Sequence, residues 1–356
     1  MRNEERMKVI IAIDSFKGCL RSSEANRAAA EGVQEAVPDA EVREIPVSDG
    51  GEGFTEAMAA ALADSGISGK TQRRAVTVHD PLMREVEAHY LLAGETAVME
   101  VAEACGLSLL KPEERNPLVA TSYGVGEMVA DAIRQGAKHI IVGLGGSGTS
   151  DAGRGMVDGL QASGFKFQEF KDIRFTIASD VNNPLCGTNG AAHVYGPQKG
   201  ATPEMVETLD AHAREFAKDT AKTMGFDRSE EPGAGTAGGL GYAFMQFLGA
   251  ERRSGIDLLL ETIGFDALAA DADLVITGEG AADRQTLMGK LPTGILRHSG
   301  TTPVMLIAGR ISDRETLLEA GFTKVECINP PGLPLEQALR PEVAKENIRK
   351  TIKNII

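Results

Sequence analysis

The sequence predicts an α/β protein: a doubly wound parallel sheet with a second α/β domain inserted into it. Strand–loop–helix units recur along the chain, and this is the repeating unit of α/β folds. Several strands are short, continuous apolar runs such as KVIIAI at 8–13, which is typical of strands buried on both faces. The length of 356 residues also favours two domains over one.

The regular units lie toward the two ends of the chain, and we expect both ends to form one sheet. Near the N-terminus, helices are expected over 22–37, with a serine cap, and over 54–64. A closing helix is expected from about Pro341, since proline favours the first helical turn. The remaining expected elements are strands at 42–47, 274–277, 304–308 and 324–328 and a helix near 289–299.

The middle of the chain is less regular, and we expect it to form the inserted domain. Three strands close together, at 76–78, 86–92 and 97–101, suggest a partial meander. A strand at 138–144 and helices at 154–162, 203–223 and 237–248 follow. The predicted domains are therefore 1–75 plus 270–356, and 76–269.

Composition excludes several function classes. The net charge of −14 leaves no basic footprint for nucleic acid or for an anionic membrane. The four cysteines form no CxxC pair, so a structural zinc site or a disulfide scaffold is not indicated. The charged first residues are unlike a signal peptide, and no run of 18 apolar residues occurs. We therefore expect a cytoplasmic protein.

Glycine is unusually frequent, with 41 residues, where an average chain of this length has about 25. Most glycine clusters lie where a strand ends and a helix begins, which is where open α/β sheets bind ligands. Two segments match GxGxxG, at 143–148 and 233–238. Each is equally consistent with a phosphate-binding loop and with tight turning. The acidic residue that a dinucleotide site needs has no clear candidate in the following stretch.

Charged and hydroxyl side chains accompany these glycines. Carboxylates gathered around a phosphate would repel it unless they hold Mg²⁺ or accept a proton. Any single carboxylate, cation or hydroxyl of the set is equally consistent with helix capping or a solvated loop. The carboxylates are Asp14, Asp49, Glu52, Asp151, Asp180, Glu279 and Asp283; the cations are Lys17, Lys199, Arg284 and Lys290; the hydroxyls are Ser15, Ser147, Thr149 and Ser150.

Eight motifs, in this order, resemble the bacterial type I glycerate kinases, from about residue 8 to 310. They are DSFKG (14–18), SDGGEG (48–53), RNPL (115–118) followed by TSYGVGE, GLGGSGTSDAG (143–153), DVNNPLCG (180–187), YGPQKGA (195–201), PGAGTAGGLG (232–241) and DLVITGEG (273–280).

The resemblance implies transfer of the γ-phosphoryl group of ATP to D-glycerate, in most family members at the 2-hydroxyl, with Mg²⁺ required. It implies a flavodoxin-like domain built from both termini, a second α/β domain inserted in it, and a site in the cleft between them. The expected partners are thus ATP and D-glycerate, and the expected assembly is a monomer or a homodimer.

Roles for the matched residues follow as hypotheses from the chemistry of phosphoryl transfer, which needs positioning, charge neutralisation and a proton acceptor. One of Asp14, Asp49 and Asp180 would be the base, and Lys17 would assist catalysis. Asp151 and Asp180 would reach the metal. Substrate or phosphate contacts are expected from Ser15, Glu52, Gly145, Gly146, Ser147, Thr149, Lys199, Glu279, Asp283 and Lys290.

The chain departs from the family pattern at Gly148, Ser150 and Ala152, where alanine, asparagine and glycine are usual, and it is shorter around 164–174. These changes leave the substrate open. A kinase of a related hydroxy acid, a non-catalytic sensor of sugar acids and a nicotinamide-dependent dehydrogenase are the alternatives.

Overall fold

The computed structural model describes residues 6–48, 50–51, 53–62 and 71–356. Asp49 and Glu52, two of the expected site residues, lie outside this range. The described residues form two compact units, the first comprising 6–48, 56–62 and 256–356 and the second 50–51, 53–55 and 71–255. Compared with the division near 75 and 270 that the sequence suggested, residues 50–51, 53–55 and 71–75 lie in the second unit and residues 256–269 lie in the first. Among the described residues, no helix has the length and apolar character needed to cross a membrane.

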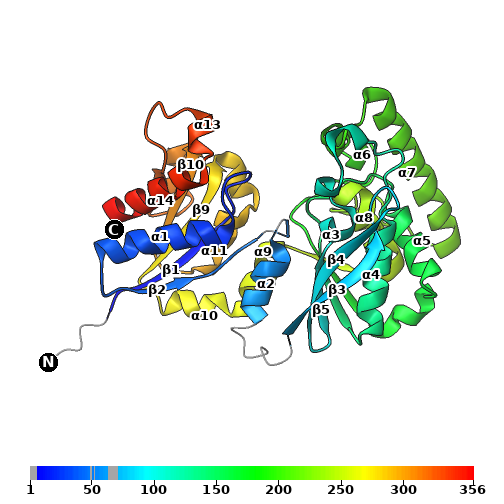
Figure 1. The fold of residues 1–356 in the computed structure, drawn as a ribbon, viewed down its shortest axis with the longest axis horizontal. Coiled ribbons are helices and arrows are strands. Elements are labelled where there is room, and N and C mark those ends of the chain that lie inside the picture. The colour runs from blue at the N-terminus through cyan, green and yellow to red at the C-terminus, as the bar shows by residue number, and fades with distance from the viewer. Residues whose placement is uncertain (1–5, 49, 52, 63–70) are drawn as a thin grey trace. The chain divides into compact units, whose positions relative to one another are not determined.

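The first unit is built on a five-stranded parallel sheet, in the order β11-β10-β9-β1-β2 (Figure 1). Numbered along the chain, this is the 2-1-3-4-5 order of flavodoxin-like folds. The expectation of a flavodoxin-like domain is confirmed. The strands are β1 (Lys8–Ile13), β2 (Glu41–Glu44), β9 (Leu274–Ala282), β10 (Val304–Ile311) and β11 (Lys324–Cys327).

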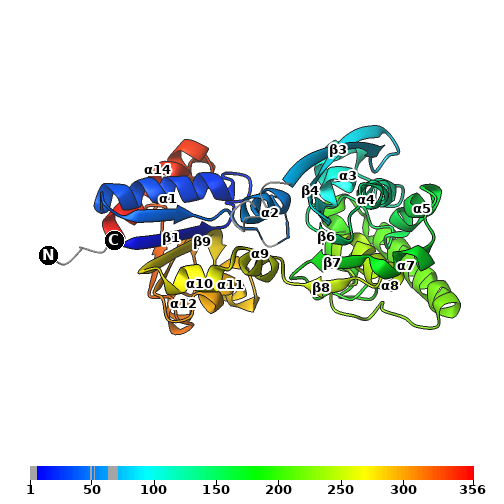
Figure 2. The same ribbon diagram turned by 90° about the horizontal axis from the view of Figure 1, so that it is seen from below.

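Helices cover both faces of this sheet (Figure 2). On one face α1 (Ser22–Ala36) packs against α14 (Pro341–Ile355), and Ile348 and Ile352 join the apolar core there. The opposite face carries α10 (Phe265–Ala270) and α11 (Leu291–His298). The unit also contains α12 (Arg314–Glu319), α13 (Leu335–Ala338) and, apart from their first residues, α2 (Phe54–Leu62) and α9 (Gly255–Ile263).

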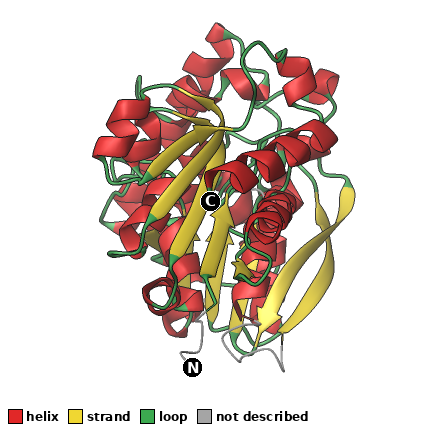
Figure 3. Ribbon diagram, turned by 90° about the vertical axis from the view of Figure 1, so that its left-hand side faces the viewer, coloured by secondary structure: helices red, strands yellow, loops and turns green. Residues whose placement is uncertain are grey.

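The second unit has a six-stranded sheet in the sequential order β3 to β8. The first three strands are antiparallel, as the expected meander, and β3 and β4 form a long pair (Figure 3). The later strands pair in parallel. They are β3 (Thr71–His79), β4 (Glu85–Ala93), β5 (Thr96–Glu100), β6 (His139–Gly143), β7 (Arg174–Ala178) and β8 (Glu251–Arg253).

Helices α3 to α8 lie on one side of this sheet (Figure 2). All of them except α6 share one large apolar core with the sheet, whereas Ala192 of α6 packs with Val206 and Leu209 of α7 in a small separate cluster. Met128, Met156 and Phe244 are among the fully buried side chains of that core. The helices are α3 (Ala102–Cys105), α4 (Tyr123–Arg134), α5 (Arg154–Ala162), α6 (Ala191–Tyr195), α7 (Pro203–Met224) and α8 (Leu240–Leu248).

Three expectations about local structure were wrong. Strand β9 does not end at residue 277 but continues to Ala282, because glycine lets β10 approach closely: a Cβ on Gly278 would lie 2.5 Å from the Ile307 carbonyl oxygen. Ser22 does not cap its helix; its hydroxyl donates to the Ile13 carbonyl (2.6 Å). The helix expected from residue 237 begins at Leu240, after a turn with positive φ at 237–239.

Candidate functional site

The glycine-rich segment at 143–153 follows β6 and turns sharply at the carboxyl end of the second sheet. Gly145 donates its N–H to the Gly50 carbonyl oxygen (3.1 Å), and a Cβ on Gly145 would lie 2.4 Å from the Cα of Gly51. Gly50 and Gly51 are therefore packed backbone to backbone against the glycine-rich loop, and only glycine fits at position 145.

The loop leaves several backbone donors without a partner. Gly148 donates to the Cys105 carbonyl (2.7 Å), but the N–H groups of Gly146, Ser147, Thr149 and Ser150 make no hydrogen bond within the described part of the chain. The buried Ser150 hydroxyl likewise has no partner there. Unsatisfied N–H groups gathered in one turn, here with Gly146 at a φ of 75°, form the kind of concave donor array that binds anions.

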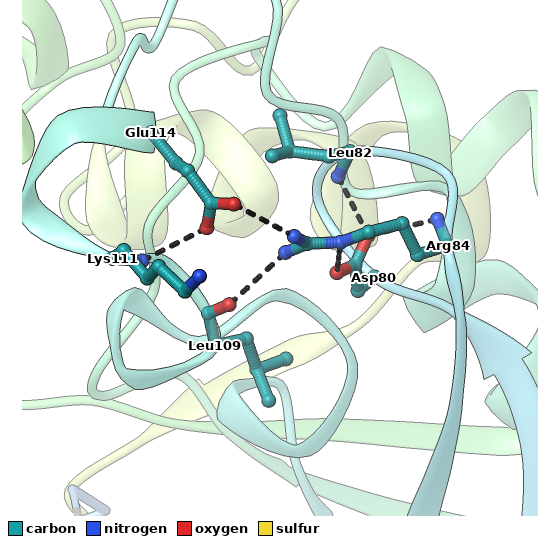
Figure 4. Close-up of polar contacts among 6 residues, drawn as sticks. All are labelled: Asp80, Leu82, Arg84, Leu109, Lys111 and Glu114. Carbon is teal, nitrogen blue, oxygen red and sulfur yellow. Dashed lines mark hydrogen bonds and ion pairs between the residues drawn. The ribbon is translucent and has the colours of Figure 1, made fainter.

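The segment Gly106–Leu107 packs against one side of this loop. The Leu107 N–H donates to the Gly146 carbonyl (2.8 Å), which with the Gly148 contact makes a short antiparallel bridge. The following turns are held by the Arg84 guanidinium, which contacts Asp80 (2.6 Å), Glu114 (2.9 Å) and the Leu109 carbonyl (3.2 Å; Figure 4). These contacts hold the turns that follow Gly106–Leu107 in place, and none of them was expected from the sequence.

Lys199 lies beneath the loop instead of facing solvent. Its side chain is only 3% exposed, and its ammonium donates to the Thr149 carbonyl oxygen (2.6 Å) and to Ser147 Oγ (3.0 Å). Burial lowers the pKa of Lys199 to about 8, partly offset by Asp151 and Cys105 nearby. The Lys199 ammonium, which we expected to contact a substrate, is thus hydrogen-bonded to the loop itself.

Asp151 is the N-terminal anchor of α5. Its carboxylate accepts the N–H groups of Ser122 (2.8 Å), Gly153 (3.0 Å) and Gly155 (3.1 Å), and the Ser122 hydroxyl (2.9 Å). These donors occupy both carboxylate oxygens. The geometry therefore favours a structural role for Asp151 over the metal-binding role that we expected.

Asp180 follows β7, the neighbour of β6, so it emerges at the same sheet edge as the glycine-rich loop. The segment is braced on both sides. The Arg252 guanidinium donates to the Ser179 carbonyl (3.1 Å), and the Ser179 hydroxyl contacts that of Thr236 (3.2 Å). Asp180 itself is half-buried, and its carboxylate oxygen Oδ2 is closed off from solvent.

In the first unit, the expected residues meet at the topological switch point between β1 and β9. Asp14 follows β1, and its N–H donates to the Gly278 carbonyl oxygen (2.9 Å). The Ser15 N–H donates to the Asp14 carboxylate (2.7 Å), and Lys17 is exposed one turn further on. Ligands of doubly wound sheets bind at this point.

The second half of that group is a hydrogen-bonded chain that runs from Glu279, within β9, to residues that follow the strand. Thr286 donates its hydroxyl to Glu279 (2.6 Å) and accepts the Asp283 N–H (3.0 Å). The Lys290 ammonium lies 3.5 Å from the Glu279 carboxylate and 4.0 Å from that of Asp283. Burial raises the pKa of Glu279, which the Thr286 bond and Lys290 partly oppose.

One carboxylate near the glycine-rich loop was missed. Glu100 ends β5 beside Gly143 and accepts the Thr55 N–H (2.8 Å), and burial raises its pKa. A polar residue closing the apolar run TAVM was the available signal. Cys105, also beside the loop, is sealed: burial raises the pKa of its thiol to about 12, so it is no nucleophile.

Among the described residues, no group of three or more histidine, cysteine, aspartate and glutamate side chains is arranged to hold a metal ion. Proteins usually bind Mg²⁺ through one or two carboxylates together with substrate phosphates. The separate carboxylates found here fit an ion that arrives with a nucleotide and do not fit a cage built by the protein alone.

Comparisons with known proteins agree along the whole chain. The model of the glycerate kinase family matches residues 9–169 and 162–356. A glycerate kinase of Bacillus subtilis and a glycerate 2-kinase of Escherichia coli are each 38% identical, over 98% of this chain and 97% of theirs. A crystal structure assigned as glycerate kinase 2 of Salmonella typhimurium LT2 superimposes with a TM-score of 0.81, at 38% identity, over 99% of this chain and 97% of that one.

The comparisons also bear on the shortened segment. The two matched pieces of the family model meet at 162–169, at the start of the stretch around 164–174 that the sequence marked as short. The alignments with the two curated relatives extend over 379 and 383 residues, so they include positions that this 356-residue chain lacks.

Proposed function

Because the chain belongs to the glycerate kinase family and is a kinase, we propose that it transfers the γ-phosphoryl group of ATP to D-glycerate. The 2-hydroxyl is the proposed acceptor, giving 2-phosphoglycerate. Support for that position comes from the Escherichia coli relative, which is named a glycerate 2-kinase.

The observation that carries the proposal is the set of unpaired donors in the glycine-rich loop. A phosphoryl group in transfer and the carboxylate of glycerate are both oxyanions, and both need fixed donors. The N–H groups of Gly146, Ser147 and Thr149, which make no hydrogen bond within the described part of the chain, would supply such donors. Since their positions are set by the backbone, they need no rearrangement when the anion binds.

The acceptor hydroxyl needs a base within hydrogen-bond reach. Asp14 and Asp180 follow the strands at which each sheet would bind a ligand, and we propose that one of them, or Asp49, takes the proton. Lys17 and Lys290 are the accessible cations beside Asp14 and Glu279 and would bind phosphate oxygens. Mg²⁺, when bound with ATP, neutralises phosphate charge.

The expectation of a site in a cleft between the two domains stays a prediction, as does a monomeric or homodimeric assembly. Phosphorylation of related hydroxy acids also stays a prediction, because Ser150 stands where the family usually has asparagine.

The test is ADP release from Mg-ATP with D-glycerate, L-glycerate, tartronate or glycerol as the acceptor. We expect turnover with D-glycerate and none with glycerol, which has no carboxylate. Asp14→Asn, Asp49→Asn and Asp180→Asn are compared in the same assay; loss of the base should reduce kcat by about 10²–10⁴-fold in one of them. Near-normal turnover in all three would refute the assignment of the base.

A further inference from the structure

Lys199 has a position that its charge alone does not explain. An exposed cation in a substrate loop would contact the substrate directly, but this ammonium is buried and bonded to Ser147 and Thr149. Both partners belong to the loop with the unpaired N–H groups. What matters is therefore how the ammonium changes the loop.

The direction of the hydrogen bond to Ser147 is fixed by chemistry. An ammonium has three N–H donors and no lone pair, so the serine oxygen must accept. The Ser147 hydroxyl proton is then left to donate elsewhere, and within the described ranges Ser147 Oγ has no second partner. Since Lys199 is still mostly protonated at pH 7, with a pKa of about 8, the arrangement holds near neutrality.

The bond to the Thr149 carbonyl has a similar effect on the backbone. In a trans peptide the carbonyl oxygen and the next N–H point in opposite directions, and the described chain contains no cis peptide bond. Lys199 holds the Thr149 oxygen on one side, so the Ser150 N–H is directed to the other. The backbone of Gly238 packs against this carbonyl, and only glycine leaves room for it, because a Cβ at position 238 would lie 2.0 Å from the same oxygen.

We propose that Lys199 is a positioning residue that turns Ser147 into an obligate hydrogen-bond donor to a substrate oxyanion, a carboxylate or a phosphate. The proposal rests on the proposed kinase function. Lys199 does not touch the anion; it orients the Ser147 hydroxyl and the Ser150 N–H, and the anion binds to these donors.

The experiment is a double-mutant cycle with Ser147→Ala, Lys199→Met and the double variant, read as KM for D-glycerate, KM for ATP and kcat. Loss of one hydrogen bond to a charged group should raise one KM by about 10–100-fold in Ser147→Ala, with a smaller change in kcat. An effect on glycerate identifies the carboxylate; an effect on ATP identifies a phosphate. Lys222→Met, an exposed lysine paired with Asp219 in the same unit, is the control and should match the wild type.

If Lys199 acts through Ser147, adding Ser147→Ala to Lys199→Met changes that KM by less than about threefold. Independent, multiplying effects would overturn the proposal, and so would a loss of thermal stability with neither KM changed. If Lys199→Met does not fold, Ser147→Thr takes its place in the test. This variant keeps the hydroxyl, so its KM should return to the wild-type value. A KM as high in Ser147→Thr as in Ser147→Ala would overturn the proposal.

Failure of the kinase function is recognised separately, because the wild type would then release no ADP with D-glycerate. In that event, isothermal titration with D-glycerate and with ATP takes the place of kinetics. Binding of one of them at least tenfold weaker in Ser147→Ala supports the inference, and equal binding of both overturns it.

Discussion

Asp151→Asn should destabilise the second unit strongly, because the substitution removes an acceptor from the start of α5. In the wild type, one carboxylate oxygen accepts from the Ser122 N–H, the Ser122 hydroxyl and the Gly155 N–H, and the other accepts from Gly153. Asparagine keeps one oxygen and places an NH₂ group against the remaining donor. All surviving bonds also lose their charge.

Hydrogen bonds to a charged group contribute about 1.5–3 kcal/mol each, against about 1 kcal/mol for neutral pairs. One lost bond and several weakened ones therefore predict that the free energy of unfolding falls by about 3 kcal/mol. Asp151→Ala should fall further. Ser122→Ala should fall less than Asp151→Ala, although it also removes the acceptor of the Met156 N–H (3.0 Å).

The chain offers a specific probe for this measurement. It has no tryptophan, and all four tyrosines, Tyr90, Tyr123, Tyr195 and Tyr242, lie in the second unit. Urea unfolding followed by tyrosine fluorescence thus reports that unit alone, and the midpoint should fall in Asp151→Asn. A variant as stable as the wild type, with turnover that requires more Mg²⁺, would refute the structural role and restore Asp151 as a metal ligand.

Three further predictions concern other parts of the structure. Lys199 should make stability depend on pH in the alkaline range. Between the pKa of about 8 in the folded state and the value of 10.5 in the unfolded state, the unfolded chain binds more protons, so the free energy of unfolding rises with pH by about 3 kcal/mol relative to Lys199→Met. A difference that does not change with pH would refute the low pKa. Asn26→Ala should cost about 2–5 kcal/mol, measured by circular dichroism in urea, because the buried Ile13 N–H (2.9 Å) and Ile45 carbonyl (2.8 Å) lose their partner; unchanged stability would contradict that. Gly238→Ala should destabilise the tyrosine-monitored unit more than Gly225→Ala, since both have positive φ but only Gly238 meets backbone atoms; equal midpoints would refute the close approach.

The placement of site residues in each sheet could be predicted because it depends on topology. Apolar runs mark the strands, and polar residues directly after them must lie at the carboxyl edge. Asp14 was found beside Glu279 in this way, although β9 continues past Glu279 to Ala282, and Asp180 was found at the same sheet edge as the glycine-rich loop.

What the sequence did not reveal depends on contacts between segments far apart in the chain. Lys199 occurs in a polar stretch, and nothing in PQKGA shows that its ammonium is buried 50 residues away from its partner Thr149. Ala237 adopts a φ of 55°, which alanine does not signal. Glu100 was missed because one polar residue at the end of a strand resembles a solvated terminus until its burial is known.

The central claim is phosphorylation of D-glycerate at the 2-hydroxyl, and phosphorus NMR of the product from Mg-ATP and D-glycerate tests it most directly. The account predicts a phosphomonoester whose phosphorus couples to a single proton, that of the CH at position 2, together with an equal amount of ADP. Coupling to the two protons of the CH₂ group would show phosphorylation at position 3. If the protein binds ATP or glycerate but forms no phosphoester product, the account is contradicted altogether.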